Sequence, residues 1–203
     1  MKKTITLAMT GASGAPYTLR LLEQLLEGGH RVQFLCSQPG QVVLAMESDL
    51  KLSSSPRQMQ QELVNYFGCA SDRLAVYGRD QWTAPVASGS SVADAMVVCP
   101  CSMGTLACIA QGISNNLIHR AADVVIKEQR KLIIVPRETP FSSIHLEHML
   151  RLSQLGVVIL PPNPGFYQGV EGVQDLIDFV VSRILDQLGI ANNLSPRWAS
   201  TED

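Results

Sequence analysis

Short runs of aliphatic and β-branched residues recur along the chain, and longer segments with helical periodicity separate most of them. The runs that predict strands are Ile5–Met9, Val32–Cys36, Ala95–Cys99, Leu132–Val135 and Val157–Leu160, with Arg73–Tyr77 as a short extra strand. Hydrophobicity within the runs is continuous rather than alternating, which is typical of strands covered on both faces. The pattern therefore predicts a mainly parallel sheet between two layers of helices.

The segments between these runs predict the helices. Ala15–Leu26 has a leucine stripe along one face, and Gly28 and Gly29 give a stop signal. The other predicted helices are Gln38–Met46, Pro56–Tyr66, Ser102–Ala110, Asn115–Gln129, Ser142–Leu152 and Val173–Leu188. We expect a single-domain, doubly wound, Rossmann-like three-layer α/β sandwich over residues 1–190, followed by a peripheral tail over 191–203.

Composition narrows the classes of partner. The 203 residues include 46% hydrophobic ones and carry a formal net charge of −2, so no basic field draws the chain to nucleic acid. No stretch approaches the roughly 18 apolar residues of a membrane span, and no signal peptide is evident. Five cysteines are an odd number, and three of them lie in or beside predicted strands. This usage favours reduced thiols in a cytoplasmic protein.

The turn Gly11-Ala12-Ser13-Gly14, between the first strand and the first helix, is the first candidate site. Glycines let the backbone approach a phosphate, and the helix N-terminus supplies oriented N–H groups. The alternative is an ordinary tight turn. The dinucleotide fingerprint needs a third spaced glycine and a carboxylate after strand two, where Cys36-Ser37-Gln38 stands instead. NAD is therefore disfavoured, and a mononucleotide such as FMN remains open.

A second strand-to-helix junction, Cys99–Thr105, is rich in small and hydroxyl residues. Two such turns at neighbouring strand ends would flank the crevice where open α/β sheets bind ligands. Zinc is the weak alternative here. Only one residue separates Cys99 from Cys101, and no second ligand pair is evident, so we expect no metal.

Further charged and aromatic side chains follow later strands. Arg137 and Glu138 follow the fourth strand, where Arg137 could hold a phosphate and Glu138 could transfer a proton; a local ion pair is the alternative. Trp82 lies in the long loop Gly78–Val92, either as its anchor or as an aromatic wall for a cationic intermediate. Four further candidates are scattered along the chain. Arg120 and Lys127 are seven residues apart and so lie on one face of a predicted helix, while Tyr167 and Arg183 occur later in the sequence.

Taken in order, these segments resemble the UbiX-type flavin prenyltransferases, a family formerly described as 3-octaprenyl-4-hydroxybenzoate carboxy-lyases. The resemblance covers almost the whole chain, and it is the ordered set that is specific. The matching segments are Leu7–Ala15, Pro85–Ser91, Cys99–Leu106, Asn115–Val124, Val135–Pro140 and Pro164–Tyr167.

The resemblance implies an enzyme that transfers a dimethylallyl group from dimethylallyl monophosphate to N5 and C6 of reduced FMN, without a metal. The product, prenylated FMN, would serve a UbiD-type decarboxylase, with ubiquinone biosynthesis as the expected pathway. The family forms homododecamers with sites at subunit interfaces, so we expect some site residues to come from a neighbouring copy.

Site residues follow from the same resemblance, position by position. The flavin site would comprise Gly11, Ala12, Ser13, Ser37, Ser102, Met103, Gly104, Thr105 and Arg137. The prenyl phosphate would meet Arg120, Lys127, Arg137, Tyr167 and Arg183. The positions that match catalytic ones are Ser13, Glu47, Trp82 and Glu138.

Two other functions remain open. A flavin-dependent peptidyl-cysteine decarboxylase shares a related Pro-Ala-Ser loop, but it carries an asparagine there and a catalytic histidine early in the chain. The loop Pro85–Ser91 has no asparagine, and none of the four histidines takes the early position. A non-catalytic flavin-delivery subunit is the second alternative. An acid such as Glu138 among cations argues against passive storage.

Overall fold

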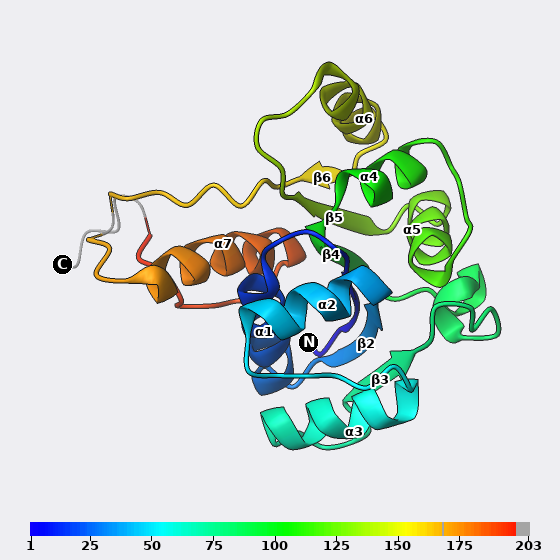
Figure 1. Cartoon of the computed structure of the whole chain (residues 1–203), viewed down its shortest axis with the longest axis horizontal. Helices are drawn as coiled ribbons and strands as arrows, with labels where there is room; N and C mark the ends of the chain where they lie inside the picture. The colour runs from blue at the N-terminus through cyan, green and yellow to red at the C-terminus, as the bar shows by residue number, and fades with distance from the viewer. Residues whose placement is uncertain (168, 198–203) are drawn as a thin grey trace.

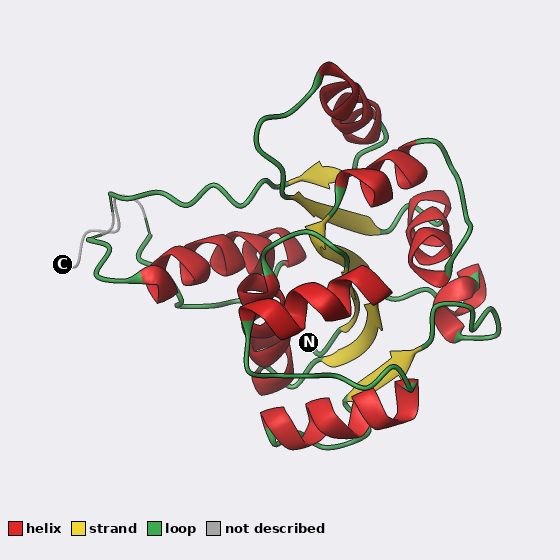
Figure 2. Ribbon diagram, viewed as in Figure 1, coloured by secondary structure: helices red, strands yellow, loops and turns green. Residues whose placement is uncertain are grey.

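The computed structural model describes residues 1–167 and 169–197 and shows one six-stranded sheet between helical layers (Figures 1 and 2). The strands are β1 (Thr4–Met9), β2 (Arg31–Cys36), β3 (Leu74–Tyr77), β4 (Ala95–Cys101), β5 (Lys131–Pro136) and β6 (Val158–Ile159). Their order is β3-β2-β1-β4-β5-β6, and every pair is parallel. The predicted doubly wound parallel sheet is confirmed, including the short extra strand, which forms one edge.

Seven α-helices occur in the described part of the chain. They are α1 (Ala15–Glu27), α2 (Gln38–Glu47), α3 (Pro56–Phe67), α4 (Met103–Ala110), α5 (Leu117–Lys127), α6 (Ser143–Gln154) and α7 (Val173–Leu188). Two short 3₁₀ helices, Pro85–Ala87 and Gly89–Ser91, lie within the segment predicted as the longest loop. None of these helices is long and apolar enough to cross a membrane.

Among the element boundaries that differ from the prediction by a few residues, two have clear local reasons. The helix predicted from Asn115 begins at Leu117, because the Asn116 side chain accepts a hydrogen bond from the His119 amide (3.0 Å) and caps the helix. The predicted strand Val157–Leu160 is reduced to Val158–Ile159, because it pairs with β5 at two positions only.

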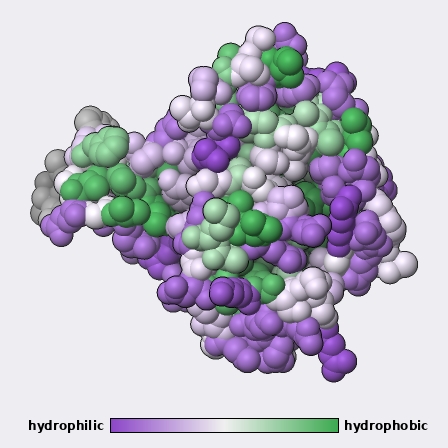
Figure 3. Space-filling model, in the orientation of Figure 1, coloured by the Kyte–Doolittle hydropathy of each residue, from purple (hydrophilic) through white to green (hydrophobic). Residues whose placement is uncertain are grey.

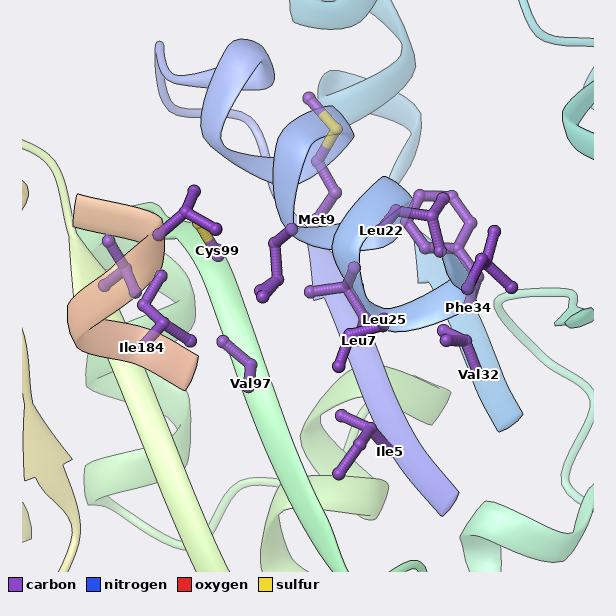
Figure 4. Close-up of a cluster of buried hydrophobic side chains, with 14 of the residues drawn as sticks. Ile5, Leu7, Met9, Leu22, Leu25, Val32, Phe34, Val97, Cys99 and Ile184 are labelled. Atoms are coloured by element: carbon purple, nitrogen blue, oxygen red, sulfur yellow. The ribbon is translucent and has the colours of Figure 1, made fainter. Parts of the chain in front are cut away.

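The two faces of the sheet bury separate cores. On one face, alternate residues of β1 (Ile5, Leu7 and Met9) pack against α1, as Figure 4 shows, and residues of α2, α3 and α7 complete this core. On the other face, Ala8 and alternate residues of β4 and β5 pack against α4, α5 and α6. Because side chains alternate along a strand, helices α5 and α7 are held on opposite faces of the sheet.

The chain reverses its direction of winding between β1 and β4, the two central strands. Thr10 joins them just beyond their carboxyl ends. Its buried hydroxyl donates to the Pro100 carbonyl (2.9 Å) and accepts from the Ser102 amide (2.8 Å), while its own amide also donates to Pro100 (3.2 Å). These bonds fix the turn after β1 against the turn after β4, which is where open α/β sheets bind ligands.

Replacing Thr10 with valine keeps the shape and removes both hydroxyl bonds. Since a buried partner is then left unsatisfied, we expect Thr10→Val to lower the free energy of unfolding by about 1–3 kcal/mol. Thr83→Val, at an exposed threonine, is the control and should change it by less than about 0.5 kcal/mol. Equal denaturant midpoints for the two variants would show that the Thr10 bonds contribute nothing.

Candidate functional site

A cavity of about 460 Å³ opens at the winding reversal, beyond the carboxyl ends of β1, β2 and β3. Its walls include the N-terminal ends of α2, α4 and α5. Five of the predicted flavin residues line it, namely Gly11, Ser37, Ser102, Gly104 and Thr105. The volume lies within the range of about 300–1,000 Å³ that is usual for cofactor and small-molecule sites.

Ser37 and Ser102 cap the N-termini of the two helices, α2 and α4, that face this cavity. The Ser37 hydroxyl accepts from the Gly40 amide (3.0 Å) at the start of α2, and the Ser102 hydroxyl accepts from the Thr105 amide (3.4 Å) at the start of α4. The first intrahelical bond of α4 runs from Leu106 to Ser102, so the amides of Met103 and Gly104 precede it. Such helix ends attract a phosphate through oriented N–H groups and a partial positive charge.

Gly11 and Gly104 differ in the space around them. A Cβ at Gly11 would come within 2.4 Å of Pro39 Cβ, so glycine is required for the turn after β1 to pack against α2. A Cβ at Gly104 would meet nothing within 4 Å, because that position borders the open cavity. Close approach to a ligand is therefore a reason for glycine at 104, whereas packing explains it at 11.

Glu47, the last residue of α2, occupies the N-terminus of α1. Its carboxylate accepts from the amides of Gly14 and Ala15 (both 2.9 Å) and from the Ser13 hydroxyl. The prediction that the first turn offers these amides to a phosphate therefore needs correction, because a carboxylate already uses them. The N-termini of α2 and α4 also face this cavity, and their amides can donate hydrogen bonds to a phosphate there.

The hydrogen bonds at Glu47 set its protonation. Partial burial raises the pKa of this carboxyl. The hydrogen bonds from Ser13, Gly14 and Ala15 and the nearby charge of Arg137 lower it by more, so the net pKa lies below the ordinary value. Glu47 is therefore ionised at neutral pH, and its carboxylate accepts a hydrogen bond from the Ser13 hydroxyl. Gly14, with φ +133°, gives the turn the conformation that brings these groups together.

Arg137 and Glu138 lie just after β5 in a separate pocket of about 230 Å³. Arg137 Nε is buried and has no hydrogen-bond partner among the described residues, which fits a side chain that awaits an anionic ligand. The Glu138 carboxylate accepts from the Thr139 amide (3.0 Å). The ion pairs of the described residues include none between Arg137 and Glu138, so the local-pair alternative is not observed.

Arg120 and Lys127 share one side of α5, as predicted, and lie against the loop that precedes β4. Arg120 donates to the Ala87 carbonyl (3.1 Å) and pairs with Asp123 (2.8 Å). Lys127 pairs with Glu128, and both side chains lie close to Gly89. These two cations are outside the cavity of their own chain.

Tyr167 and Arg183 meet in another pocket, of about 340 Å³, beside α7. Since α7 covers the opposite face of the sheet from α5, one chain does not bring Arg183 together with Lys127. In Figure 1 the two helices lie on opposite sides of the molecule. Trp82 is 47% exposed and is also outside the cavity, and Ala12 and Met103 lie beside it rather than in its wall.

Several wall residues escaped the sequence analysis. Tyr77 ends β3 and Arg79 lies just after it, while Asn116 caps α5 and His119 lies in its first turn. The buried His119 ring is within 2.7 Å of the Asn115 side chain, and burial followed by the charge of Arg79 lowers its pKa. The asparagine cap before an apolar run was the available signal for the start of α5.

No cluster of three or more potential metal ligands of the His, Cys, Asp or Glu type occurs among the described residues. Cys99 and Cys101, the pair considered for zinc, are both buried. Burial raises the pKa of Cys99 to about 12 and raises that of Cys101 as well. Both thiols stay protonated at neutral pH, a state that does not ligate zinc.

Comparison with known proteins decides the family. Residues 1–185 match the Flavoprotein family. A flavin prenyltransferase UbiX from Pseudomonas aeruginosa is 57% identical over 194 residues, covering 96% of this chain and 93% of that protein. The chain belongs to the UbiX family of flavin prenyltransferases. A UbiX protein from Halalkalibacterium halodurans is 46% identical over 202 residues and covers 100% of this chain and 96% of its own length.

Solved structures agree with this family and with its fold. A dodecameric FMN-dependent UbiX-like decarboxylase from Escherichia coli O157:H7 is 37% identical, with a TM-score of 0.86 over 97% of this chain and 100% of that one. AnUbiX in complex with FMN and dimethylallyl pyrophosphate is also 37% identical, with a TM-score of 0.87 over 100% of both chains. The predicted enzyme class, a flavin prenyltransferase, is confirmed by family membership.

The peptidyl-cysteine decarboxylase alternative has only the fold in its favour. A PPC decarboxylase is 19% identical, with a TM-score of 0.58 over 81% of this chain and 84% of that one. At this identity the likeness concerns the arrangement of the sheet and helices. It carries no argument about the reaction.

The Glu47 cap predicts a pH-dependent stability difference. A carboxyl whose pKa is lowered by folding stabilises the protein above its unfolded pKa and loses this effect as pH falls through the folded one. Glu47→Gln should therefore lower the free energy of unfolding at pH 7, by about 0.3–1 kcal/mol for a charge at a helix N-terminus. The difference from wild type should shrink below the ordinary carboxyl pKa of 4.5.

Denaturant unfolding at pH 7 and pH 3 measures both quantities. Glu147→Gln, an exposed position on α6, is the matched control and should be neutral at both values. A Glu47→Gln deficit that stays constant down to pH 3 would show that packing, not charge, accounts for the effect.

Proposed function

We propose that this protein transfers a dimethylallyl group from dimethylallyl monophosphate to N5 and C6 of reduced FMN, and that prenylated FMN is released to a UbiD-type decarboxylase, with ubiquinone biosynthesis as the pathway served. The observation that carries the proposal is a cavity between the N-termini of α2 and α4 in a chain 57% identical to a flavin prenyltransferase. The AnUbiX complex with FMN and dimethylallyl pyrophosphate supports FMN and a dimethylallyl phosphate ester as the two substrates.

The residues around the cavity fit a flavin mononucleotide. Ser37, Ser102 and Thr105 would hold the FMN phosphate at the two helix N-termini, and the open space at Gly104 admits it. Arg137, with its unpartnered buried Nε, would contact the flavin or the donor phosphate. Reduced FMN supplies two nucleophilic positions, N5 and C6.

Cations of this chain would promote the departure of the donor phosphate. The bond between the prenyl C1 and oxygen breaks, and its electron pair leaves with the phosphate while C1 bonds to N5. Phosphate leaves readily only when its charge is neutralised, and Arg120, Lys127 and Arg183 supply that charge while Glu138 protonates the leaving oxygen. Trp82 would place its ring against the positive charge that develops on the allyl group.

Two further groups would handle protons near the flavin. Ser13, held by the ionised Glu47, would form a hydrogen bond near N5. Bonding of C1 to N5 releases the N5 proton. Closure of the second ring bond uses the prenyl double bond, which takes up one proton as its C3 bonds to C6, and C6 then releases one proton; Glu138 or the departed phosphate would carry these protons.

The separation of the cations supports a site shared between copies. Lys127 and Arg183 lie on opposite faces of one sheet, so we propose that neighbouring subunits bring them together in a homo-oligomer, most simply a dodecamer like the E. coli relative. Exposed apolar side chains gather on α2 (Val42 and Met46) and on the projecting segment before α7 (Phe166), as Figure 3 shows. Apolar patches of this kind mark interaction surfaces.

The cysteines support a reducing compartment. All five are free thiols, and Cys36, Cys99 and Cys101 are in or beside central strands, where burial raises the pKa of each. We therefore propose that the protein works in the cytoplasm.

The direct test is anaerobic incubation of the purified protein with reduced FMN and either dimethylallyl monophosphate or the pyrophosphate. Mass spectrometry should show flavin that has gained one five-carbon unit, with the monophosphate as the better donor. No gain with either donor would refute the proposed function.

Glu138→Gln tests the proton-transfer role. Loss of a positioned general acid should slow single-turnover prenylation by about 10²- to 10⁴-fold while FMN binding stays intact. Glu27→Gln, at an exposed position of α1, is the control and should match wild type. An unchanged rate for Glu138→Gln would remove Glu138 from the mechanism.

A further inference from the structure

Asp186, one turn beyond Arg183 on α7, is shared by two arginines. Arg183 Nη1 donates to its Oδ2 (2.7 Å). Arg197, in the segment after α7, donates from Nη1 to Oδ2 (2.7 Å) and from Nη2 to Oδ1 (2.8 Å), a bidentate fork. Asn192 adds a third donor at Oδ1 (3.2 Å).

The burial of these groups differs. The Asp186 side chain is 17% exposed, whereas those of Arg183 and Arg197 are 51% and 53% exposed. Asp186 is therefore a fixed centre, and the guanidinium groups are the parts that can move. The hydrogen bond from Arg197 is the largest cause that lowers the pKa of Asp186, ahead of the charge of Arg183.

The carboxylate paired with Arg183 differs from those paired with the other candidate phosphate-binding cations. Arg120 is paired with Asp123, and Lys127 with Glu128, each through one carboxylate. Among the ion pairs of residues 1–167 and 169–197, only the carboxylate beside Arg183 is also held by a cation from a separate segment of the chain.

We propose that Arg197 is a positioning residue for Arg183: by holding Asp186 in a bidentate pair, it lets the Arg183 guanidinium turn from Asp186 to the phosphate of the prenyl donor. The proposal rests on the proposed function, because it takes Arg183 as a phosphate ligand. Tyr167, the other proposed ligand on this side, lines the same pocket as Arg183, Asp186 and Arg197. The segment after α7, predicted as peripheral, would thus contribute to substrate affinity.

The physical reason is competition for one cation. A carboxylate at 2.7 Å attracts Arg183 and opposes its contact with a phosphate. Because Arg197 neutralises most of the Asp186 charge, moving the Arg183 guanidinium away from Asp186 costs less free energy. Without Arg197 the full charge of Asp186 acts on Arg183, so the affinity for the donor phosphate should fall.

Arg197→Ala should raise the KM for dimethylallyl monophosphate about tenfold, equivalent to about 1.4 kcal/mol, with little change in kcat. The dissociation constant of the same donor, measured by calorimetry with oxidised FMN present so that no turnover occurs, should rise equally. Arg57→Ala, at an exposed arginine on α3, is the control and should leave both unchanged.

The double variant separates positioning from a structural role. The double variant Asp186→Asn/Arg197→Ala removes the competing carboxylate charge. Its KM and dissociation constant should return to within about twofold of wild type, since no charge at position 186 then holds Arg183. A merely structural clamp predicts the opposite, a double variant at least as impaired as Arg197→Ala. For Arg197→Lys, the KM and the dissociation constant should lie between those of wild type and Arg197→Ala. This variant replaces Arg197→Ala in the test if Arg197→Ala melts at a lower temperature than wild type.

The outcomes distinguish this inference from the proposed function. If wild type forms prenylated FMN but Arg197→Ala and Arg197→Lys bind the donor like wild type, the positioning role is wrong and the function stands. If wild type itself forms no product, the proposed function fails first, and the inference fails with it.

Discussion

The paired hydrogen bonds of Thr10 hold together the two strands on which the site depends. β1 and β4 are adjacent in the sheet, but the chain leaves them toward opposite faces, so the turns after them are not joined by sheet hydrogen bonds. Thr10 supplies this link by bonding Pro100 and Ser102 at once. The cavity beyond these strands keeps its shape because one buried hydroxyl fixes both turns.

The same winding that creates the cavity also divides the cations. Lys127 on α5, which follows β4, and Arg183 on α7, which follows β6, lie on opposite faces with the sheet between them. One chain therefore has a cavity between helix N-termini, but it does not bring Lys127 and Arg183 together. In the proposed mechanism, a neighbouring copy would supply the charge that the fold of one chain keeps apart.

Continuous hydrophobic runs were sufficient to predict the parallel sheet, because burial on both faces leaves a strong local signal. The hydroxyl-rich junction Cys99–Thr105 marked Ser102, and the family resemblance marked Ser37; the structure shows that both cap helices. Local patterns did not reveal that Glu47 would occupy the start of α1, since that contact joins residues 32 and 33 positions apart. The sequence also could not show why position 11 is glycine. The pattern predicted close contact with a phosphate, but the structure shows that Gly11 packs against Pro39, a contact between two turns that are distant in the sequence.

The central claim is that the donor phosphate is bound by residues from both faces of the sheet, and therefore from different copies. Co-expression of Lys127→Ala with Arg183→Ala, followed by purification of oligomers that contain both chains through two affinity tags, tests it most directly. Each variant alone should form little prenylated FMN. Mixed oligomers should recover roughly a quarter of wild-type activity, because random assortment restores that share of two-subunit sites. Mixed oligomers no more active than either variant alone would contradict a shared site.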